Sequence, residues 1–118
     1  MRTFVLVKMV VPGWHCWAQA PDSVGYLRHP HRHLFTFRVQ LEVTDDDRQV
    51  EFHLLRARMV QLIEQWPAAQ WAADGYDFGG NSCEMLARWM LGVLLDPSQR
   101  GAVEVHEDDE NGARVDRL

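Results

Sequence analysis

Three histidines have the residue type and the spacing of a metal site. His15 stands alone, whereas His31 and His33 open a long segment in which apolar and polar residues alternate. Side chains two positions apart on a strand share one face of the sheet, so these two imidazoles should lie on the apolar face of that strand. A third imidazole from a neighbouring strand would complete a three-histidine zinc site with one open position, as in catalytic zinc sites. The alternative is that the histidines lie on the surface near a turn, and their placement at the start of a strand favours the metal site.

Length and composition indicate one small globular domain over residues 1–118. Of the 118 residues, 47% are hydrophobic and 25% are charged, as in ordinary soluble proteins. A domain of this size has little room for both a core and a deep cleft of its own, so we expect an oligomer with sites between subunits. The net charge is −5 and there is no basic patch, which argues against nucleic acid as a partner.

Cysteine usage and hydropathy favour a cytoplasmic protein without a membrane segment. Cys16 and Cys83 are too few for a disulfide framework, and the simplest interpretation is two free thiols in a reducing compartment. The first residues lack the basic, apolar and small-residue pattern of a signal peptide. No apolar run approaches the roughly 20 residues needed to span a bilayer.

The hydrophobic pattern predicts the element order β-β-α-α-β-β, because a period of two marks strands and a period near 3.6 marks helices. In chain order we expect a strand over 3–11, a loop over 14–30, a strand over 31–44, an extended stretch over 49–52, a helix over 54–66, a connection over 67–80, a helix capped by Asn81 and Glu84 that ends near Leu95, and strands over 103–107 and 113–118. Pro12-Gly13 should end or bend the first strand. Asn111-Gly112 predicts a hairpin turn.

Several segments in this order carry a resemblance to a known family. They are Trp14-His15, His31–Phe35, Glu51–Ala57, Asn81–Trp89 and Val103–Glu107. They stand where the family has its first zinc histidine, H-G-H-N-Y, D-F-x-D-L-K, P-T-x-E-N-L-A-x-W and a strand that ends in a pterin-anchoring glutamate. The chain thus resembles the 6-pyruvoyl-tetrahydropterin and 6-carboxy-tetrahydropterin synthases over its whole length. The resemblance implies the tunnelling fold, an α+β fold with two antiparallel helices on one face of a four-stranded antiparallel sheet.

The resemblance also implies a site. Its zinc ligands would be His15, His31 and His33, with zinc acting as a Lewis acid on the oxygens of the substrate side chain. Glu107 would accept the N–H groups of a pterin ring, because a carboxylate binds two parallel donors well; judged without the resemblance, it would be a solvated acid. Ser82 and Cys83 would offer backbone N–H groups to the ring. Family members form trimers that stack into hexamers, so the resemblance implies a homo-trimer or homo-hexamer.

Two departures from the family concern proton transfer. Family enzymes carry a cysteine or a glutamate about four residues before the H-x-H motif, where this chain has Leu27. They also carry an Asp-His pair after the first helix, where this chain has Pro67 and Ala68. General acid and base groups typically contribute roughly 10²–10⁴-fold each, so their loss should cripple the usual reaction unless other residues replace them.

The candidates for that replacement are His29, Cys16, Tyr26 and Asp77. Cys16 lies beside a predicted ligand, where a metal would lower the pKa of its thiol; the alternative is a small buried side chain. His29 would be a proton shuttle or a spare ligand, and the alternative is a surface histidine. Trp14 and Trp17 flank His15, and they would either stack on a flat heterocycle or pack at a subunit interface.

Three functions stay open at this point. The first is a zinc-dependent lyase or synthase of the pterin or deazapurine (queuosine) pathways that acts on a dihydroneopterin triphosphate-like molecule. The second is a catalytically retired member that keeps the metal and serves binding or assembly. The third is an unrelated small zinc hydrolase, with Glu51 or Glu107 as the base for a zinc-bound water. We favour the first, with Zn²⁺ as the cofactor.

Overall fold

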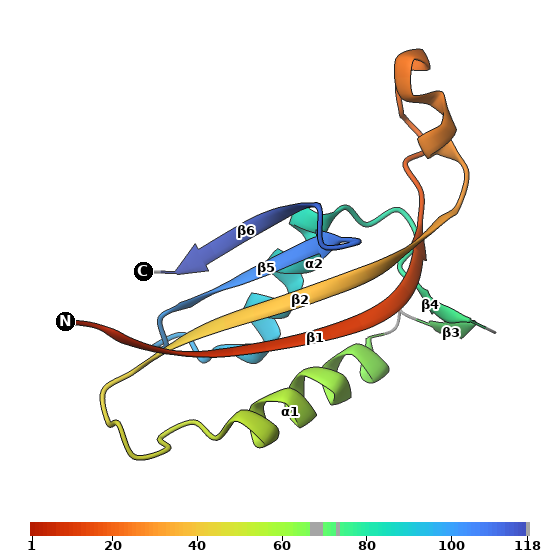
Figure 1. The fold of residues 1–118 in the computed structure, drawn as a ribbon. Coiled ribbons are helices and arrows are strands. Elements are labelled where there is room, and N and C mark those ends of the chain that lie inside the picture. The colour runs from red at the N-terminus through yellow and green to blue at the C-terminus, as the bar shows by residue number, and fades with distance from the viewer. Residues whose placement is uncertain (67–69, 73, 118) are drawn as a thin grey trace.

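The fold is built around two long antiparallel strands. The computed structural model describes residues 1–66, 70–72 and 74–117. In it, β1 (Thr3–His15) pairs with β2 (His31–Val43) along the whole length of both strands (Figure 1). Apolar and polar residues alternate on both strands, which suits a sheet with one buried face. The register places His15 directly opposite His31 at one end of the pair.

The other strands extend this pair into a sheet with the order β3-β4-β1-β2-β5-β6. β5 (Gly101–Glu107) pairs antiparallel with β2, and β6 (Asn111–Arg117) pairs antiparallel with β5. β3 (Gln70–Ala72) and β4 (Gly75–Asp77) form a short hairpin, and β4 runs parallel to the end of β1. The four long strands are the predicted antiparallel sheet. The short hairpin lies within the segment that we predicted as a plain connection, and it corrects that prediction.

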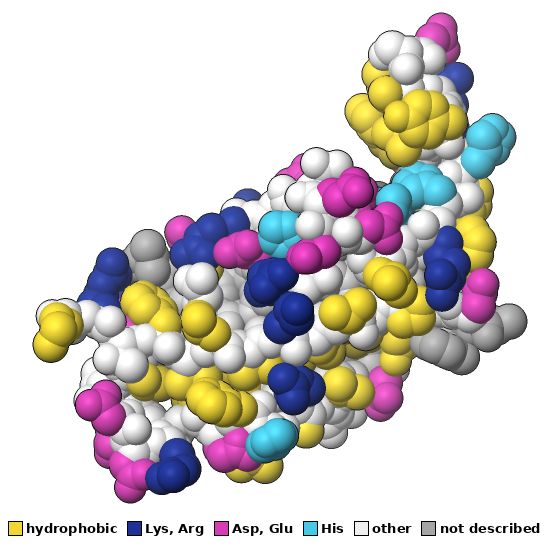
Figure 2. Space-filling view, viewed as in Figure 1, with side chains coloured by type: hydrophobic (Ala, Val, Ile, Leu, Met, Phe, Trp, Pro, Cys, Tyr) yellow, Lys and Arg dark blue, Asp and Glu magenta, His cyan; other side chains and the backbone are white. Residues whose placement is uncertain are grey.

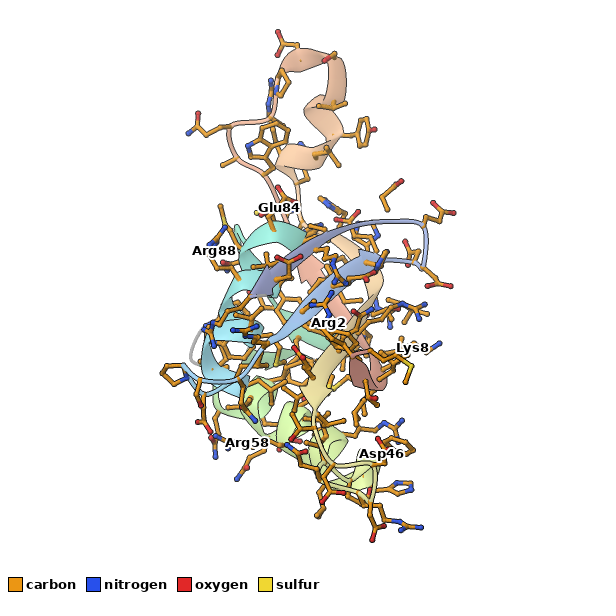
Figure 3. The ribbon with its side chains drawn as sticks, turned by 90° about the vertical axis from the view of Figure 1, so that its left-hand side faces the viewer. Arg2, Lys8, Asp46, Arg58, Glu84 and Arg88 are labelled. Carbon is orange, nitrogen blue, oxygen red and sulfur yellow. The ribbon has the colours of Figure 1, made fainter. Side chains whose placement is uncertain are left out.

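Two helices cover one face of the sheet, α1 (Phe52–Gln65) and α2 (Cys83–Leu94) (Figure 1). The largest fully buried side chains lie between these layers: Phe35, Phe37, Phe78, Met59, Ile63, Leu86 and Met90. The opposite face of the sheet is open, and Figure 3 shows Lys8 of β1 pointing away from the helices. The predicted α+β class and the order of the four long strands and two helices are therefore confirmed, whereas the β3–β4 hairpin between the helices was not predicted. None of the described helices is long and apolar enough to cross a membrane.

The segment 16–30, which joins β1 to β2, is more ordered than the predicted loop. It contains a 3-10 helix, η1 (Asp22–Arg28), that stands away from the rest of the chain (Figures 1 and 2). Internal hydrogen bonds hold the segment together. The Arg28 side chain donates to the Ala20 carbonyl (2.7 Å) and to the Asp22 carboxylate (2.6 Å). We call residues 16–30 the η1 segment.

Two strand boundaries differ from the prediction. β1 continues through Pro12-Gly13 to His15, because β4 joins it only at its end and proline is tolerated on strand edges. The turn between β5 and β6 lies at residues 108–110, whereas Asn111-Gly112 belongs to β6. Asp108 and Asp109 take the left-handed conformation there, with φ of 52° and 56°, a region in which aspartate is enriched over most other residues.

Two helix starts also differ from the prediction. Phe52 belongs to α1 and not to an extended stretch, because the Glu51 carboxylate accepts a backbone N–H of the first turn and so caps the helix there. Ser82, and not Asn81, caps α2, since its Oγ accepts the Met85 N–H at 3.2 Å. The cap places Ser82 at the edge of the site described next.

Candidate metal centre

The end of the β1–β2 pair brings together the three predicted metal ligands. His15, His31 and His33 each offer one nitrogen, and these atoms lie within 4.8 Å of one another. The ring centroids of His15 and His31 are 4.5 Å apart, and both rings lie about 5 Å from His33. Figure 2 shows histidine side chains gathered at the base of the η1 segment, beside acidic side chains. The cross-strand register of β1 and β2 and the alternation of side chains on β2 therefore bring the three rings together.

Each of the three rings has a hydrogen-bond partner at Nδ1. The Asn81 carbonyl lies 2.9 Å from Nδ1 of His15, and the His29 carbonyl lies 2.9 Å from Nδ1 of His31. A carbonyl only accepts, so Nδ1 carries the proton in both rings and Nε2 keeps its lone pair. The third ring, His33, faces a carboxylate oxygen of Asp108 at 2.7 Å. Outer partners of this kind orient metal-binding histidines in metalloproteins.

The Nε2 atoms of two of the rings, on the side away from these outer partners, have no hydrogen-bond partner among the described residues. Nε2 of His15 and Nε2 of His33 are buried and make no hydrogen bond within the described residues. The Glu107 carboxylate lies 3.0 Å from the first and 3.6 Å from the second, without hydrogen-bond geometry. An unsatisfied buried polar atom costs about 1–3 kcal/mol. These lone pairs therefore fit a metal ion, which would satisfy both nitrogens at once.

Aromatic packing below the histidines supports the centre. The Phe35 ring is fully buried and contacts His15 and His33 edge-on, at 5.1 and 5.6 Å between centroids. Phe78 packs against Phe35 at 5.0 Å. Gly13 leaves room for both phenylalanine rings, since a Cβ there would lie 2.4 Å from Phe78. The candidate metal position thus has a close-packed apolar floor, which leaves no room for water below the rings.

Burial sets the protonation of several groups around the centre. It is the main cause that lowers the pKa of His15, which keeps this ring neutral as a ligand must be. The hydrogen bond from His33 is the main cause that lowers the pKa of Asp108. Burial, and next the charge of Glu107, raise the pKa of Cys83 to about 12. The Cys83 thiol therefore stays protonated and donates to a Glu107 oxygen at 3.8 Å.

A cavity of about 490 Å³ opens beside the histidines. Its described lining residues are His15, Cys16, Trp17, Leu27, His31, Gly80, Asn81, Ser82, Cys83, Glu84, Met85, Glu107, Asn111 and Gly112. Trp17 and Leu27 of the η1 segment and Met85 contribute apolar side chains to this lining. Glu84 and Glu107 contribute carboxylates. This described lining contains no lysine or arginine, so the cavity suits a flat molecule with N–H donors better than a polyanion.

The structure brings most of the predicted site residues to this cavity, but not all. Cys16, Ser82, Cys83 and Glu107 line it, as does the non-titrating Leu27. Pro67 and Ala68, at the family positions of the Asp-His pair, lie outside the described residues.

Some predicted site residues lie outside the described lining of the cavity, among them the candidate ligand His33. Trp14 points to the opposite face of β1 from His15, where its indole donates to Asp74 at 2.9 Å. The prediction that Trp14 lies at the substrate position is therefore corrected, and the tryptophan that lines the cavity is Trp17. His29 contributes its carbonyl to His31, but its ring is not in the described lining. The same holds for the side chains of Tyr26 and Asp77, and the latter instead accepts a backbone N–H of the following turn.

Sequence reasoning missed Glu84, Met85 and Asp108. The sequence predicts Glu84 as half of a capping box, and its place in the first turn of α2 explains both that signal and its position at the cavity. Asp108 lies in an acidic turn that resembles a solvated surface, and nothing local marks it as a partner of His33.

Comparison with known proteins establishes the fold. No protein-family model matches the sequence, and no curated protein matches it. Solved structures of 6-pyruvoyl tetrahydropterin synthase from Plasmodium vivax do match. The enzyme superposes with a TM-score of 0.66 at 16% identity, over 99% of this chain and 98% of that one. Two variants, with a catalytic-residue glutamate replaced by alanine or by cysteine, give TM-scores of 0.67 and 0.62 at 14% and 13% identity over the same shares of both chains.

The chain therefore has the fold of the 6-pyruvoyl tetrahydropterin synthases over nearly its whole length. The predicted tunnelling fold, and with it the resemblance at the level of the fold, is confirmed. An unrelated small zinc hydrolase, the third alternative from the sequence, is not favoured by this likeness.

Proposed function

We propose that the chain is a zinc-dependent lyase or synthase of the pterin type, acting on a reduced bicyclic heterocycle such as dihydroneopterin triphosphate. One observation carries the proposal: three imidazoles, two of them with an unpartnered buried nitrogen, lie together beside a cavity that His15 and His31 line, in a chain with the synthase fold. The cavity volume of about 490 Å³ supports a small-molecule substrate.

His15, His31 and His33 would hold the metal through Nε2, since their Nδ1 atoms are engaged outward. Bound zinc supplies a Lewis acid for the oxygens of the substrate side chain. The chain's own part is to keep the three rings neutral and oriented. The Phe35 floor excludes water below them, which strengthens every charge interaction above it.

The two carboxylates and the apolar side chains of the lining would bind the ring system. Glu84 and Glu107 offer acceptors for ring N–H groups, and the Cys83 thiol orients Glu107 by donating to it. Trp17, half exposed in the η1 segment, offers a flat surface for stacking. The lining described here offers no cation to a triphosphate, so we propose that the ring enters the cavity and the phosphates stay outside it.

Proton transfer is the weakest match to the family, because Leu27 lines the cavity where family members have an acid or base. We propose Cys16 as the replacement, since its half-buried thiol lines the cavity next to His15. A role for His29 is less supported, because its ring is not in the described lining.

We propose a homo-trimer or homo-hexamer as the working form. β6 is one edge of the sheet, and β1 has no strand partner on its outer side before Gly13 among the described residues. Two unpaired edges on opposite sides of one sheet can pair head to tail between copies and close a ring. Both cysteines are free thiols, which supports the proposal of a cytoplasmic location.

Metal content and molar mass of the purified protein test the proposal first. We expect about one zinc per chain in a trimer or hexamer, measured by elemental mass spectrometry and light scattering. His31→Ala should abolish zinc, and His53→Ala, at an exposed histidine on α1, should keep it. A metal-free wild-type protein would overturn the site.

Turnover then separates an enzyme from a retired member. The protein is incubated with dihydroneopterin triphosphate and, in parallel, with unphosphorylated dihydroneopterin, and products are resolved by chromatography with fluorescence detection. Product that depends on zinc and is lost in Cys16→Ala supports the full proposal. A zinc-loaded protein that converts neither compound would contradict the proposed catalysis and leave a binding protein with the same centre.

A further inference from the structure

The turn between β5 and β6 is joined to the start of β2 by three hydrogen bonds. One oxygen of the Asp108 carboxylate lies 2.7 Å from Nδ1 of His33. The other oxygen accepts the Leu34 N–H at 2.8 Å, and the Asp108 N–H donates to the Leu34 carbonyl at 2.8 Å. Both carboxylate oxygens and the backbone of one residue thus act on two consecutive residues of β2. This arrangement fixes where the carboxylate meets the imidazole.

The backbone of this turn is held in an uncommon conformation. Asp108 and its neighbour Asp109 both have positive φ, 52° and 56°, which costs energy in residues other than glycine. Such conformations persist where the surroundings determine them. At Asp108 the surroundings are His33 and Leu34, whereas the Asp109 carboxylate binds Arg38 at 2.8 Å on the open side of the sheet. Two adjacent residues therefore share charge and conformation, but only one contacts the candidate ligands.

The three rings do not have equivalent outer partners. His15 and His31 face backbone carbonyls, which no substitution of a side chain removes directly. At Nδ1, the outer nitrogen, only His33 of the three rings faces a side-chain carboxylate within the described part of the chain. A carboxylate behind a metal-bound imidazole fixes the tautomer and raises the basicity of the ring more than a neutral carbonyl does.

We propose that Asp108 is a positioning residue that aims Nε2 of His33 at the metal and sets the affinity of the centre. The inference rests on the metal site proposed above and deepens it. Asp108 reaches the centre only through His33, because it is not among the described lining residues of the cavity. The acidic turn after β5 is thus a functional part of the site, and its place in the sequence, 75 positions from His33, hides this role.

The neighbouring aspartate provides a matched control. Metal-free wild type, Asp108→Ala and Asp109→Ala are titrated with zinc against a chromophoric chelator. Both alanines remove one negative charge from the same turn and sit at nearly the same positive φ, so their backbone costs are alike. We expect Asp108→Ala to weaken zinc binding by roughly 10–100-fold, the usual effect of losing such a partner. Asp109→Ala should bind zinc as the wild type does.

A third variant covers the case in which Asp108→Ala does not fold. Asn tolerates positive φ, and Asp108→Asn keeps an acceptor for the ring while it removes the charge. We expect an intermediate affinity and an altered absorption spectrum of the cobalt-substituted protein, because the ligand field of His33 changes. Thermal unfolding of all metal-free forms shows whether a loss of affinity follows a loss of stability.

The outcomes separate the two proposals. Equal weakening by Asp108→Ala and Asp109→Ala would overturn the positioning role, because the turn would then act through structure alone. Wild-type affinity in Asp108→Asn together with an unchanged cobalt spectrum would also overturn it. A wild-type protein that binds neither zinc nor cobalt would instead refute the metal centre itself. Selective weakening at Asp108, without a matching loss of unfolding temperature, would support the inference.

Discussion

A single methyl group at Gly13 should disturb both the core and the metal centre. Gly13 lies on β1 opposite His33 and two residues before His15. A Cβ there would lie 2.4 Å from Cε2 and 2.7 Å from Cδ2 of Phe78, and 2.9 Å from Cδ2 of Phe35. Ordinary contacts between carbon atoms are about 3.5–4.0 Å. In Gly13→Ala the Phe78 ring must therefore move by roughly 1 Å in a core packed without voids.

The magnitude follows from the burial of these rings. Phe35 and Phe78 are both fully buried, at 0% exposure, so neither can turn toward solvent to make room. Overpacking of this kind typically costs about 1–3 kcal/mol. For a domain of this size, that corresponds to a decrease of roughly 4–12 °C in the unfolding temperature. Phe35 also supports His15 and His33, so zinc affinity should fall as well.

The assay is thermal and urea unfolding of the metal-free protein, with Gly92→Ala as the control. Gly92 lies on the exposed side of α2, and a Cβ there meets nothing within 4 Å. The same substitution should stabilise the protein at that position by about 0.5–1 kcal/mol, because alanine favours a helix interior over glycine. The same glycine-to-alanine substitution should therefore lower the free energy of unfolding at Gly13 and raise it at Gly92.

A second variant makes the reasoning refutable at the level of the contact. Phe78→Leu removes the ring edge that the new methyl group meets, so Gly13→Ala should cost less in a Phe78→Leu background than in wild type. A double-mutant cycle measures this coupling. An unfolding temperature of Gly13→Ala equal to or above that of wild type, or strict additivity in the cycle, would show that the close approach does not limit packing.

Three further results are expected. The free energy of unfolding of the metal-free protein should decrease as the pH falls below about 6.5, because burial lowers the pKa of His15 from its ordinary value of 6.5 and the unfolded chain then takes up a proton that the folded chain resists. Urea titrations across this range should show a smaller decrease in His15→Gln than in wild type, and an equal decrease would contradict the argument. Iodoacetamide at neutral pH should modify Cys16 and spare the buried Cys83, whose pKa is raised to about 12, and peptide mass spectrometry that found equal labelling would refute this. Ser82→Ala should reduce stability by about 0.5–2 kcal/mol in urea unfolding, because the Met85 N–H loses its capping partner; an unchanged midpoint would mean that the cap contributes nothing.

The local sequence pattern alone predicts the long strands and helices and shows which side chains share a face. The alternation of residues 31–43 placed His31 and His33 on the side of Phe35 and Phe37, because side-chain direction in a strand depends only on position. The helix predicted over 54–66 has its buried residues three or four positions apart, at Leu55, Met59, Leu62 and Ile63, which is the spacing that the prediction depends on. Short elements were missed or misplaced, because a three-residue strand such as β4 and a turn such as 108–110 have too few residues to show a period.

Which residues form the site depends on tertiary contacts, and no local sequence pattern predicts these. Adjacent positions on β1 face opposite ways, so Trp14 points away from the cavity while Trp17, beyond the strand end, turns into it. To predict which tryptophan faces the cavity, one must know the residue at which β1 ends, and the Pro12-Gly13 signal placed that end too early.

The sequence by itself determined that this chain has two long strands, two covering helices and three histidines suited to one metal, since these follow from residue type and short-range spacing. Only the tertiary structure decided which groups stand behind those histidines. Asp108 meets His33 across 75 positions, and the Asn81 carbonyl meets His15 across 66. Contacts of that span depend on strand register, turn conformation and packing taken together, and these are properties of the folded chain as a whole.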